Sequence, residues 1–458
     1  MTRFTGKGDL TEGSIRGHLV RLSLPMIWGI LSIISFQLVD TYYISLLGTD
    51  YLAAISFTFP VTMTVFSLII GMGIGMSSVL SRKIGAGNHE EIIRIATHGV
   101  VLAALVALCV TFLGLLLIKP IFHVMGADAR MMPIITDYMT IWFAGILFIT
   151  VPVVGNSGIR ATGDTLNPAL SMMLAAGLNA LISPFLIFGL WIFPRMEVQG
   201  AALGTLISYI FAMSFSLFIL YARKKIIFQG KFHWARFGDS AKQVLSVGLP
   251  AGLGSVIQPL TQGIITAIMA GTGVHAVAAY GVASRVEAMA FVIIMALATG
   301  MSPILGQNIG AGKIERVRET LRLSLAFCVG WSLLMAVLLG LFARPIAAVF
   351  SKDPEVVHYT MLYFWIVPFS YAAGNLVQGW ASAFNAMGQA RRSARMIIIR
   401  SLVLQIPLAF LCGHFFGAAG VFAALAGVNL ATGIYFHLRA WREITDDTDS
   451  ARLVEAAA

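Results

Sequence analysis

The sequence contains few charged residues for its length. Only 11% of its 458 residues are Asp, Glu, Lys or Arg, whereas 58% are hydrophobic and the mean hydropathy is +0.85. A soluble chain of this length would usually form several domains with about a quarter of its residues charged. The composition therefore argues against a soluble enzyme or binding module and favours a protein that resides in a lipid bilayer.

Cysteine is also scarce. Cys109, Cys328 and Cys412 lie far apart, each inside an apolar stretch, and no pair has the spacing of a disulfide framework or a metal site. We interpret them as small core side chains. The nine histidines form no HExxH pair. We therefore predict neither a metal centre nor a cofactor.

A phosphate-cradling loop is absent as well. The Gly-Lys pairs that end at Lys7, Lys231 and Lys313 all lack the Ser or Thr that should follow the lysine. Without a nucleotide-hydrolysing site, we expect any transport to be driven by an ion gradient. The start of the chain is polar and mixed in charge, so it does not predict a cleavable signal peptide.

What the sequence does contain is an internal repeat. Residues 17–440 contain two related copies of one unit, and the second copy begins 225 positions after the first. One constant offset across separate landmarks indicates a duplicated unit. The landmarks, each followed by its copy, are Pro25 and Pro250, Ala53-Ala54 and Ala278-Ala279, Gly75-Met76-Ser77 and Gly300-Met301-Ser302, Ile84-Gly85-Ala86-Gly87 and Ile309-Gly310-Ala311-Gly312, and Gly163 and Gly388.

Each copy contains six apolar stretches long enough to cross a bilayer. A spanning helix requires roughly 20 apolar residues, and backbone groups in hydrocarbon must be paired within the segment, which favours helices. We predict an all-α integral membrane protein with twelve transmembrane helices in two pseudo-symmetric six-helix lobes. The predicted spans are residues 17–47, 52–80, 95–118, 133–158, 165–192, 200–222, 240–270, 276–305, 320–343, 357–385, 393–413 and 417–438.

The repeat also predicts the domain boundaries. The N-terminal lobe, 1–222, contains the first six spans and the expected ion-coupling site. A basic cytoplasmic linker, 223–239, joins it to the C-terminal lobe, 240–440, and a cytoplasmic tail, 441–458, follows. Duplicated membrane bundles commonly bind substrate where the repeats meet and rock one repeat against the other. A transporter is therefore the first interpretation.

The distribution of positive charge indicates the orientation of the chain. With a cytoplasmic N-terminus, internal loops and tails carry 25 of the 31 Lys and Arg, and Arg285 lies within a span. By the positive-inside rule, this asymmetry predicts a multi-pass protein of the cytoplasmic (inner) membrane with both termini cytoplasmic. The basic linker then contacts anionic lipid headgroups rather than nucleic acid. The external loops carry Lys119, Arg130, Arg195, Arg344 and Lys352.

Asp40 is the clearest charge inside a span. Intramembrane charges are expensive to bury and are functional candidates by default. Asp40 lies in the outer half of the first span, and its counterpart in the second copy is Ile265, so only one half keeps a carboxylate. We predict that Asp40 couples transport to an ion. The alternative is an acid near a helix end that snorkels or is satisfied by Tyr and Gln neighbours.

Other polar residues of the first half are expected to gather around Asp40 in an ion-coupling or substrate site. Each of them alone also fits an interhelical hydrogen bond, worth about 0.6 kcal/mol in membranes. These residues are Gln37, Asn156, Asn179, Ser183 and Thr205.

The second half offers Arg285 and Glu287 as secondary candidates. They are two positions apart and face different sides of a helix, so they cannot pair simply with each other. Structural and functional roles remain open for both. Pro25, early in the first span, deletes one backbone hydrogen bond. It is either a moving hinge or a static kink.

Taken together, the chain resembles the multidrug and toxic compound extrusion (MATE) family over nearly its whole length. The resemblance implies two six-helix lobes, a V-shaped cavity, and antiport of cationic or amphipathic drugs against protons or sodium. The residues that carry it are Leu24-Pro25, Val39-Asp40-Thr41, Gly48, the paired Gly-Ala-Gly loops and Arg160-Ala161-Thr162-Gly163-Asp164.

Within that family the chain looks DinF-like. The resemblance maps the family's helix 1 acid to Asp40, its helix 4 and 5 asparagines to Asn156 and Asn179, and its helix 6 threonine to Thr205. A second helix 5 carboxylate found in some members falls on Ser183. With one carboxylate left, a proton is favoured over sodium, although Na⁺ at Asp40 stays open. The acids that the NorM-like branch carries are absent, and their stretches hold the secondary candidates Gln258 and Gln262, with Asn375 and Gln378.

We therefore expect a non-enzymatic, monomeric antiporter. In the expected cycle, ionised Asp40 favours a cationic substrate, and a proton arriving from outside neutralises it, bends the first helix at Pro25 and expels the drug. A lipid-linked precursor flippase of the same architecture is the alternative, although it would need several cationic residues in its cavity. An intramembrane enzyme is a more distant one, because Asp164 stands nearly alone at the membrane face.

Overall fold

The computed structural model describes residues 8–446 and contains no strand within them. Residues 1–7 and most of the predicted tail lie outside this part. Contacts divide the chain into two units: unit 1 comprises residues 1–9 and 24–249, and unit 2 comprises 10–23 and 250–458.

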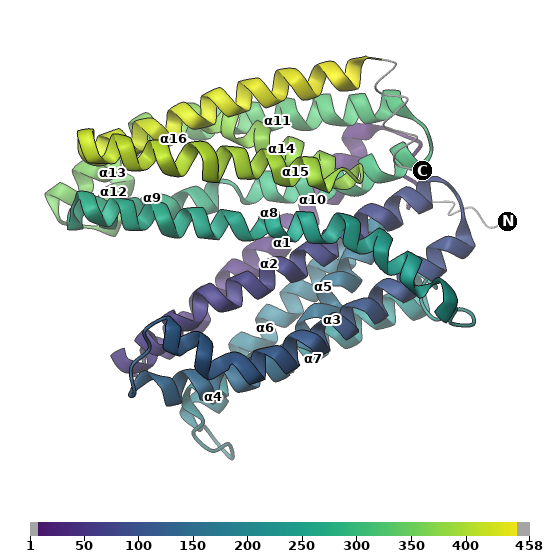
Figure 1. The fold of residues 1–458 in the computed structure, drawn as a ribbon, viewed down its shortest axis with the longest axis horizontal. Helices are drawn as coiled ribbons and strands as arrows, with labels where there is room; N and C mark the ends of the chain where they lie inside the picture. The colour runs from purple at the N-terminus through teal and green to yellow at the C-terminus, as the bar shows by residue number, and fades with distance from the viewer. Residues whose placement is uncertain (1–7, 447–458) are drawn as a thin grey trace. The chain divides into compact units, whose positions relative to one another are not determined.

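Unit 1 is a bundle of long helices (Figure 1). Its helices α6 and α7 lie side by side in closest contact, and α5 packs against α2, α3 and α7. The elements are most of α1 (Ile15–Ser45), then α2 (Thr49–Gly85), α3 (His89–Val124), α4 (Met131–Ala144), α5 (Ile146–Ala161), α6 (Leu166–Phe188), α7 (Glu197–Phe218), the π-helical turn η1 (Ile219–Arg223), the 3-10 turn η2 (Trp234–Arg236) and the start of α8 (Phe237–Thr272).

Unit 2 has the same general construction, with α14 packed against α11 and α16. It begins with residues 10–23 at the start of α1 and continues from the middle of α8. The further elements are α9 (Val274–Ala290), α10 (Val292–Gly310), α11 (Ile314–Leu341), α12 (Ala343–Phe350), α13 (Pro354–Ile366), the 3-10 turn η3 (Pro368–Ser370), α14 (Tyr371–Ala386), α15 (Ala390–Ile398), the π-helical segment η4 (Ile399–Gln405) and α16 (Ile406–Thr445).

The all-helical prediction is confirmed, and the predicted spans correspond to helices that are often broken. Nine described helices are long and apolar enough to cross a bilayer, and the α4–α5 pair, bent by 46° at its break, adds a tenth. The predicted span 357–385 is interrupted at Pro368, where η3 separates α13 from α14. The last two predicted spans form one run that leaves helical geometry at Gly417, with φ 61° and ψ −149°.

The repeated glycines occupy the same backbone conformation in both copies. Gly87 and Gly312 have φ of +77° and +70°, and Gly163 and Gly388 have φ of +76° and +83°. These left-handed conformations cost little only without a Cβ, and they end helices α2, α10, α5 and α14. The repeat retains these glycines because each terminates a helix.

The division between the units falls beside the two repeated prolines. Unit 2 includes the chain up to Ser23 and resumes at Pro250, whereas unit 1 begins again at Leu24, next to Pro25. The predicted lobe boundaries at 222 and 240 differ from this division, because the first turns of α1 and α8 each belong to the opposite unit. Both prolines lie inside helices that the structure shows as continuous.

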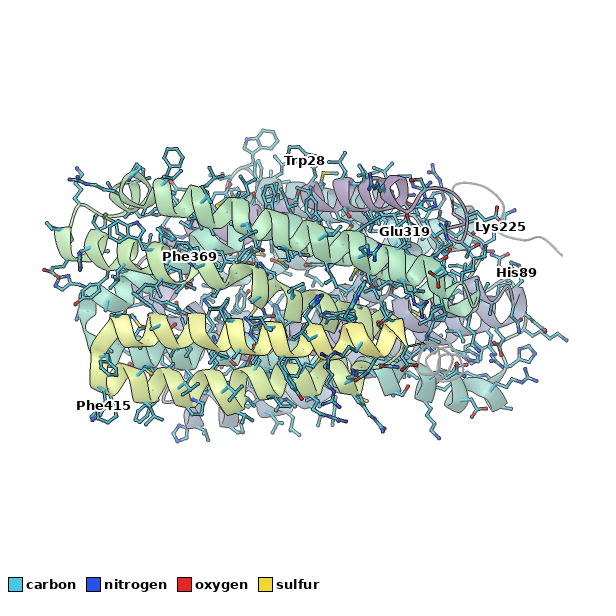
Figure 2. All side chains as sticks on the ribbon, turned by 90° about the horizontal axis from the view of Figure 1, so that it is seen from above. Trp28, His89, Lys225, Glu319, Phe369 and Phe415 are labelled. Atoms are coloured by element: carbon cyan, nitrogen blue, oxygen red, sulfur yellow. The ribbon has the colours of Figure 1, made fainter. Side chains whose placement is uncertain are left out.

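Each unit has its own apolar core. In unit 1, Gly114 accommodates the ring of Phe143, since a Cβ at Gly114 would lie 2.2 Å from it. In unit 2, Trp380 is fully buried. Many large apolar side chains are exposed instead, which suits a surface that faces lipid. Trp28 and Phe415, labelled in Figure 2, are 62% and 71% exposed.

Candidate functional site

Asp40 lies on α1 in unit 1, half-buried. Its Oδ1 is buried and has no hydrogen-bond partner among residues 8–446. Tyr138 of α4 lies close enough to experience the charge of Asp40. The α1 helix is tied to α6 nearby, where the Tyr43 hydroxyl donates to the carbonyl of Ala180 at 3.3 Å. Asp40 is therefore a carboxyl inside a span with an unused acceptor.

Asn179 is fully buried on α6. Its Nδ2 donates to Thr205 Oγ1 at 3.2 Å, and Thr205 donates its own proton to the carbonyl of Ala201 at 3.1 Å. Because the hydroxyl proton is used along α7, the threonine can only accept from Asn179, which sets the orientation of the amide. The Oδ1 of Asn179 is buried and has no partner in the described residues.

Two further predicted site residues lie on α6 or contact it. Ser183 is fully buried one turn after Asn179, and its hydroxyl finds no partner in residues 8–446. Asn156 of α5 donates its Nδ2 to Ser171 Oγ of α6 at 3.3 Å, and its Oδ1 is likewise buried and unpartnered within the described chain.

These residues form a set of unused oxygen acceptors in unit 1. Each buried polar atom left unpaired costs about 1–3 kcal/mol, and Asp40, Asn156 and Asn179 each carry one such oxygen among the described residues. Oxygen acceptors suit a proton on the carboxyl or a hard cation among oxygens. Within residues 8–446 no group of three His, Cys, Asp or Glu could hold a metal ion.

Not every predicted residue joins this set. The structure pairs Asn179 with Thr205 and Asn156 with Ser171, but it shows no hydrogen bond from Asp40 to any of them within the described residues. The Gln37 side chain is exposed, and only its backbone carbonyl is used, by the Thr41 hydroxyl. Ser171 and Tyr138 were not predicted, because residues on other helices become neighbours only by packing.

The secondary candidates of unit 2 differ in their exposure to solvent. Arg285 is exposed on α9, and Gln258 and Gln262 are exposed on α8. Glu287 is half-buried, and its Oε2 accepts a hydrogen bond from the Tyr363 hydroxyl of α13 at 2.7 Å. The interpretation that Arg285 and Glu287 do not pair with each other agrees with these positions.

Sequence reasoning missed Arg400. It was counted among the loop charges, whereas it lies in η4, within the helical run from Ala390 to Thr445. Its guanidinium donates to Asn429 Oδ1 of α16 at 2.7 Å and to the carbonyl of Gly374 of α14 at 3.3 Å. The signal was present, because Arg400 falls inside the predicted span 393–413.

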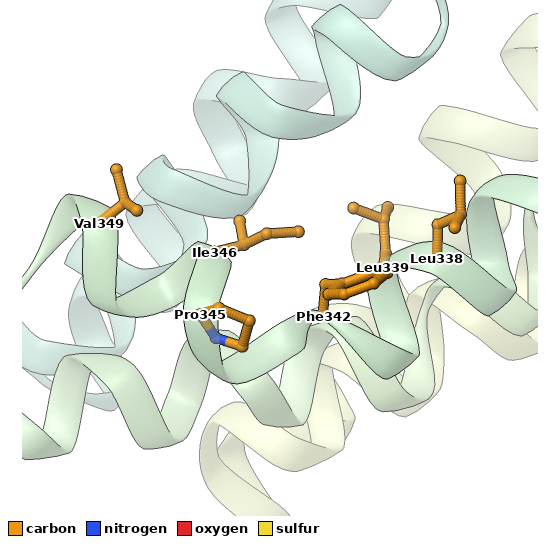
Figure 3. Close-up of a pocket in the computed structure, with 6 residues that line it drawn as sticks. All are labelled: Leu338, Leu339, Phe342, Pro345, Ile346 and Val349. Atoms are coloured by element: carbon orange, nitrogen blue, oxygen red, sulfur yellow. The ribbon is translucent and has the colours of Figure 1, made fainter.

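One apolar hollow in unit 2 is lined by none of these residues. It has a volume of ≈ 460 Å³, lies where α11 meets α12, and includes Leu339, Phe342 and Ile346 (Figure 3). Every residue that lines it is apolar. It offers no group for ion or substrate chemistry.

Comparison with known proteins identifies the chain. The MatE family model matches residues 25–185 and 250–411, so each match begins at one of the repeated prolines. This chain belongs to the MATE family. It is therefore a membrane transporter and not an enzyme.

Individual relatives of this MATE-family chain carry different names. A Shewanella oneidensis protein named as an FAD transporter is 38% identical over 434 residues, which are 94% of this chain and 96% of that protein. A Staphylococcus haemolyticus protein named multidrug export protein MepA is 27% identical over 90% of both chains. The Vibrio cholerae MATE transporter VcmN, described in the bent form, is 28% identical with a TM-score of 0.88 over 97% of this chain and 98% of its own.

Proposed function

We propose that this protein is an ion-coupled exporter of the cytoplasmic membrane and that its substrate is FAD or a molecule of the same chemistry. Such a substrate joins a flat aromatic ring system to an anionic diphosphate. The observation that carries this proposal is the 38% identity to the FAD transporter of Shewanella oneidensis, which extends over nearly the full length of both chains.

Asp40 is the proposed coupling residue. Its unpaired, buried Oδ1 supports a carboxyl that alternates between a neutral and an ionised form during the cycle. Proton coupling is favoured over sodium because the other predicted site residues, Asn156, Asn179 and Ser183, are neutral and supply no second carboxylate. One charge crossing 100 mV supplies about 2.3 kcal/mol, which corresponds to a concentration gradient of roughly fiftyfold.

The charge of the substrate changes the energetics of export. A cytoplasm that is negative inside drives an anion outward, so the membrane potential itself favours export of a diphosphate. Proton uptake at Asp40 would then act mainly to make the cycle directional. For a cationic substrate the potential opposes export, and proton antiport must supply all of the driving force.

Export of cationic or amphipathic drugs is the second candidate. Relatives named as multidrug export proteins, 24–27% identical to this chain, support it. An ionised Asp40 is also the complementary charge for a cation. The two candidates differ in the sign of their response to membrane potential.

Pro25 is the proposed hinge of the first helix. It lies next to the residue where α1 passes from unit 2 to unit 1, between Ser23 and Leu24. Proline removes a backbone hydrogen bond, which lowers the cost of bending at that point.

The test is transport in proteoliposomes loaded with FAD or with ethidium, with proton, sodium and potential gradients imposed one at a time. We expect FAD efflux that depends on the proton gradient and is accelerated by an inside-negative potential. Efflux of ethidium but not FAD would establish the drug exporter instead. Efflux of either compound that follows the sodium gradient alone would exclude proton coupling.

A further inference from the structure

Arg400 is an arginine inside a membrane span, and its hydrogen bonds within the described chain go to neutral oxygen atoms. It lies in η4, a π-helical segment between α15 and α16, and π-helical interruptions occur frequently at functional sites. Among residues 8–446 it makes no ion pair within 4.0 Å. Because a charge within a span is expensive, an arginine left in this state is a functional-site candidate.

Neutral groups hold the guanidinium of Arg400 in place. Its two contacts are to Asn429 Oδ1 and the Gly374 carbonyl, and its Nε is buried without a partner in the described residues. Asn429 in turn donates its Nδ2 to Ser370 Oγ at 3.0 Å, which directs its oxygen toward Arg400. These contacts orient the guanidinium but do not neutralise its positive charge.

The backbone of α14 can lie close to the Arg400 guanidinium because residue 374 is a glycine. A Cβ at that position would lie 3.2 Å from the Asn429 side chain and 3.3 Å from Arg400 Nη2. The glycine on α14 therefore leaves room for the guanidinium and its asparagine partner together.

Glu287 is near but does not neutralise Arg400. The two charges influence each other electrostatically. However, the Glu287 carboxylate accepts from the Tyr363 hydroxyl at 2.7 Å rather than from the guanidinium. The result is a cation fixed in position, partly accessible, and separated from the carboxylate of its own unit.

We propose that Arg400 recognises an anionic phosphate of the transported molecule. A planar guanidinium binds phosphate through two parallel hydrogen bonds and retains its charge at every physiological pH. Asn429 is the positioning residue, and Glu287 limits the affinity by repelling the anion. This assignment rests on the proposed export of a diphosphate, because it names the group that would bind it.

Two substitutions should change phosphate affinity in opposite directions. Asn429→Asp places a carboxylate where Asn429 Oδ1 lies 2.7 Å from the guanidinium, so the cation is neutralised without removing Arg400. The variant gives up the hydrogen bond to Ser370, whose hydroxyl donates to the Val367 carbonyl. Glu287→Gln keeps an acceptor for Tyr363 but removes the repelling charge. Arg400→Lys retains the charge and loses the planar fork.

The measurement is binding to the purified full-length protein, followed by flavin fluorescence for FAD and riboflavin and by calorimetry for ADP. Riboflavin has the same ring without phosphate, and ADP has the diphosphate without the flavin. We expect wild type to prefer FAD over riboflavin. Asn429→Asp should reduce FAD and ADP affinity by about tenfold or more, as expected for losing a hydrogen bond to a charged group, and should leave riboflavin unchanged.

Glu287→Gln should strengthen FAD and ADP binding, and Arg400→Lys should weaken both. Unchanged ratios of FAD to riboflavin affinity in all three variants, at unchanged melting temperature, would show that Arg400 only joins α14 to α16. Wild type that binds neither FAD nor ADP more tightly than riboflavin would also overturn the assignment. Weaker FAD binding in anionic than in neutral lipid nanodiscs would assign Arg400 to a lipid headgroup instead.

Failure of the proposed function gives a different result. If wild-type proteoliposomes do not export FAD, the substrate assignment is wrong whatever the variants show. If wild type exports FAD and the variants discriminate FAD from riboflavin as wild type does, only the role of Arg400 is wrong.

Discussion

The Nζ of Lys224 lies 2.8 Å from Asp164 Oδ2 and links the chain that follows η1 to the loop between α5 and α6. Asn167 also donates to this carboxylate, through its side chain at 2.7 Å and its backbone at 3.2 Å. Lys224 of the predicted linker is therefore held against the loop between α5 and α6. Ile226 and Ile227, which follow, are buried.

This ion pair predicts how stability responds to acid. Burial raises the pKa of Asp164, but the hydrogen bond and charge of Lys224, together with the bonds from Asn167, outweigh burial and hold the pKa below its ordinary value of 3.8. A carboxyl with a depressed pKa stabilises the folded state above its unfolded pKa and loses that contribution as the pH falls through the folded pKa.

Asp164→Asn should therefore lower the free energy of unfolding by about 1.5–3 kcal/mol near neutral pH, the scale of hydrogen bonds to a charged group. The difference from wild type should shrink as the pH falls below about 4. Thermal unfolding of the detergent-purified wild type and variant, followed from about pH 3 to about pH 7, measures this difference in the free energy of unfolding. Asp137→Asn, at an exposed position on α4, is the control. A difference that is constant at all pH values would contradict the account.

Asp40→Asn should abolish coupled export while the protein still folds. The amide keeps the size and hydrogen bonding of the carboxyl but cannot take up or release a proton. Substrate binding should persist, because apolar surface supplies most of the contact area for an aromatic ligand. Asp40→Glu should retain part of the activity with a shifted pH optimum, and Asn179→Ala should weaken coupling less.

The decisive readout is proton release on substrate addition to purified protein, with Asp137→Asn as the matched loss of an aspartate. Release by wild type and by the Asp137 variant, but not by Asp40→Asn, is the expected result. Equal release from all three proteins, or undiminished efflux by Asp40→Asn, would place the coupling site elsewhere, with Glu287 the next residue to substitute.

Pro25→Ala should slow turnover without weakening substrate binding. Alanine restores a backbone hydrogen bond in α1, which should raise the barrier to bending. Efflux rate and equilibrium binding, measured on the same preparation, separate the two effects. Pro60→Ala, inside α2 and away from the division between the units, should leave the rate unchanged. Wild-type efflux by Pro25→Ala would make this proline a static packing feature.

A tag attached after Ala458 should be inaccessible from outside intact cells. The prediction follows from the excess of Lys and Arg in the loops expected to be cytoplasmic, which is only slightly reduced by moving Arg400 into a span. A tag placed in the loop that carries Lys352 should be accessible. The reverse pattern of labelling would show that the chain has the opposite orientation in the membrane.

The pairings of the polar residues were beyond sequence analysis. Periodicity places Asn179 and Ser183 on one face of a helix, but it cannot say that Thr205 is opposite them. Glu287 and Tyr363 are 76 positions apart, and Arg400 and Asn429 are 29 apart. Such contacts depend on the packing of one helix against another, which the spacing along a single helix does not encode.

The sequence by itself determined the helical membrane fold, the duplication, the family and the singular position of Asp40. Apolar length forces helices in a bilayer, and one constant offset reveals a repeat without any structure. Only the tertiary structure decided that the division between the units passes beside Pro25 and Pro250 and that Arg400 is held by neutral partners. Both depend on which helices meet, because burial and charge compensation are properties of neighbours in space.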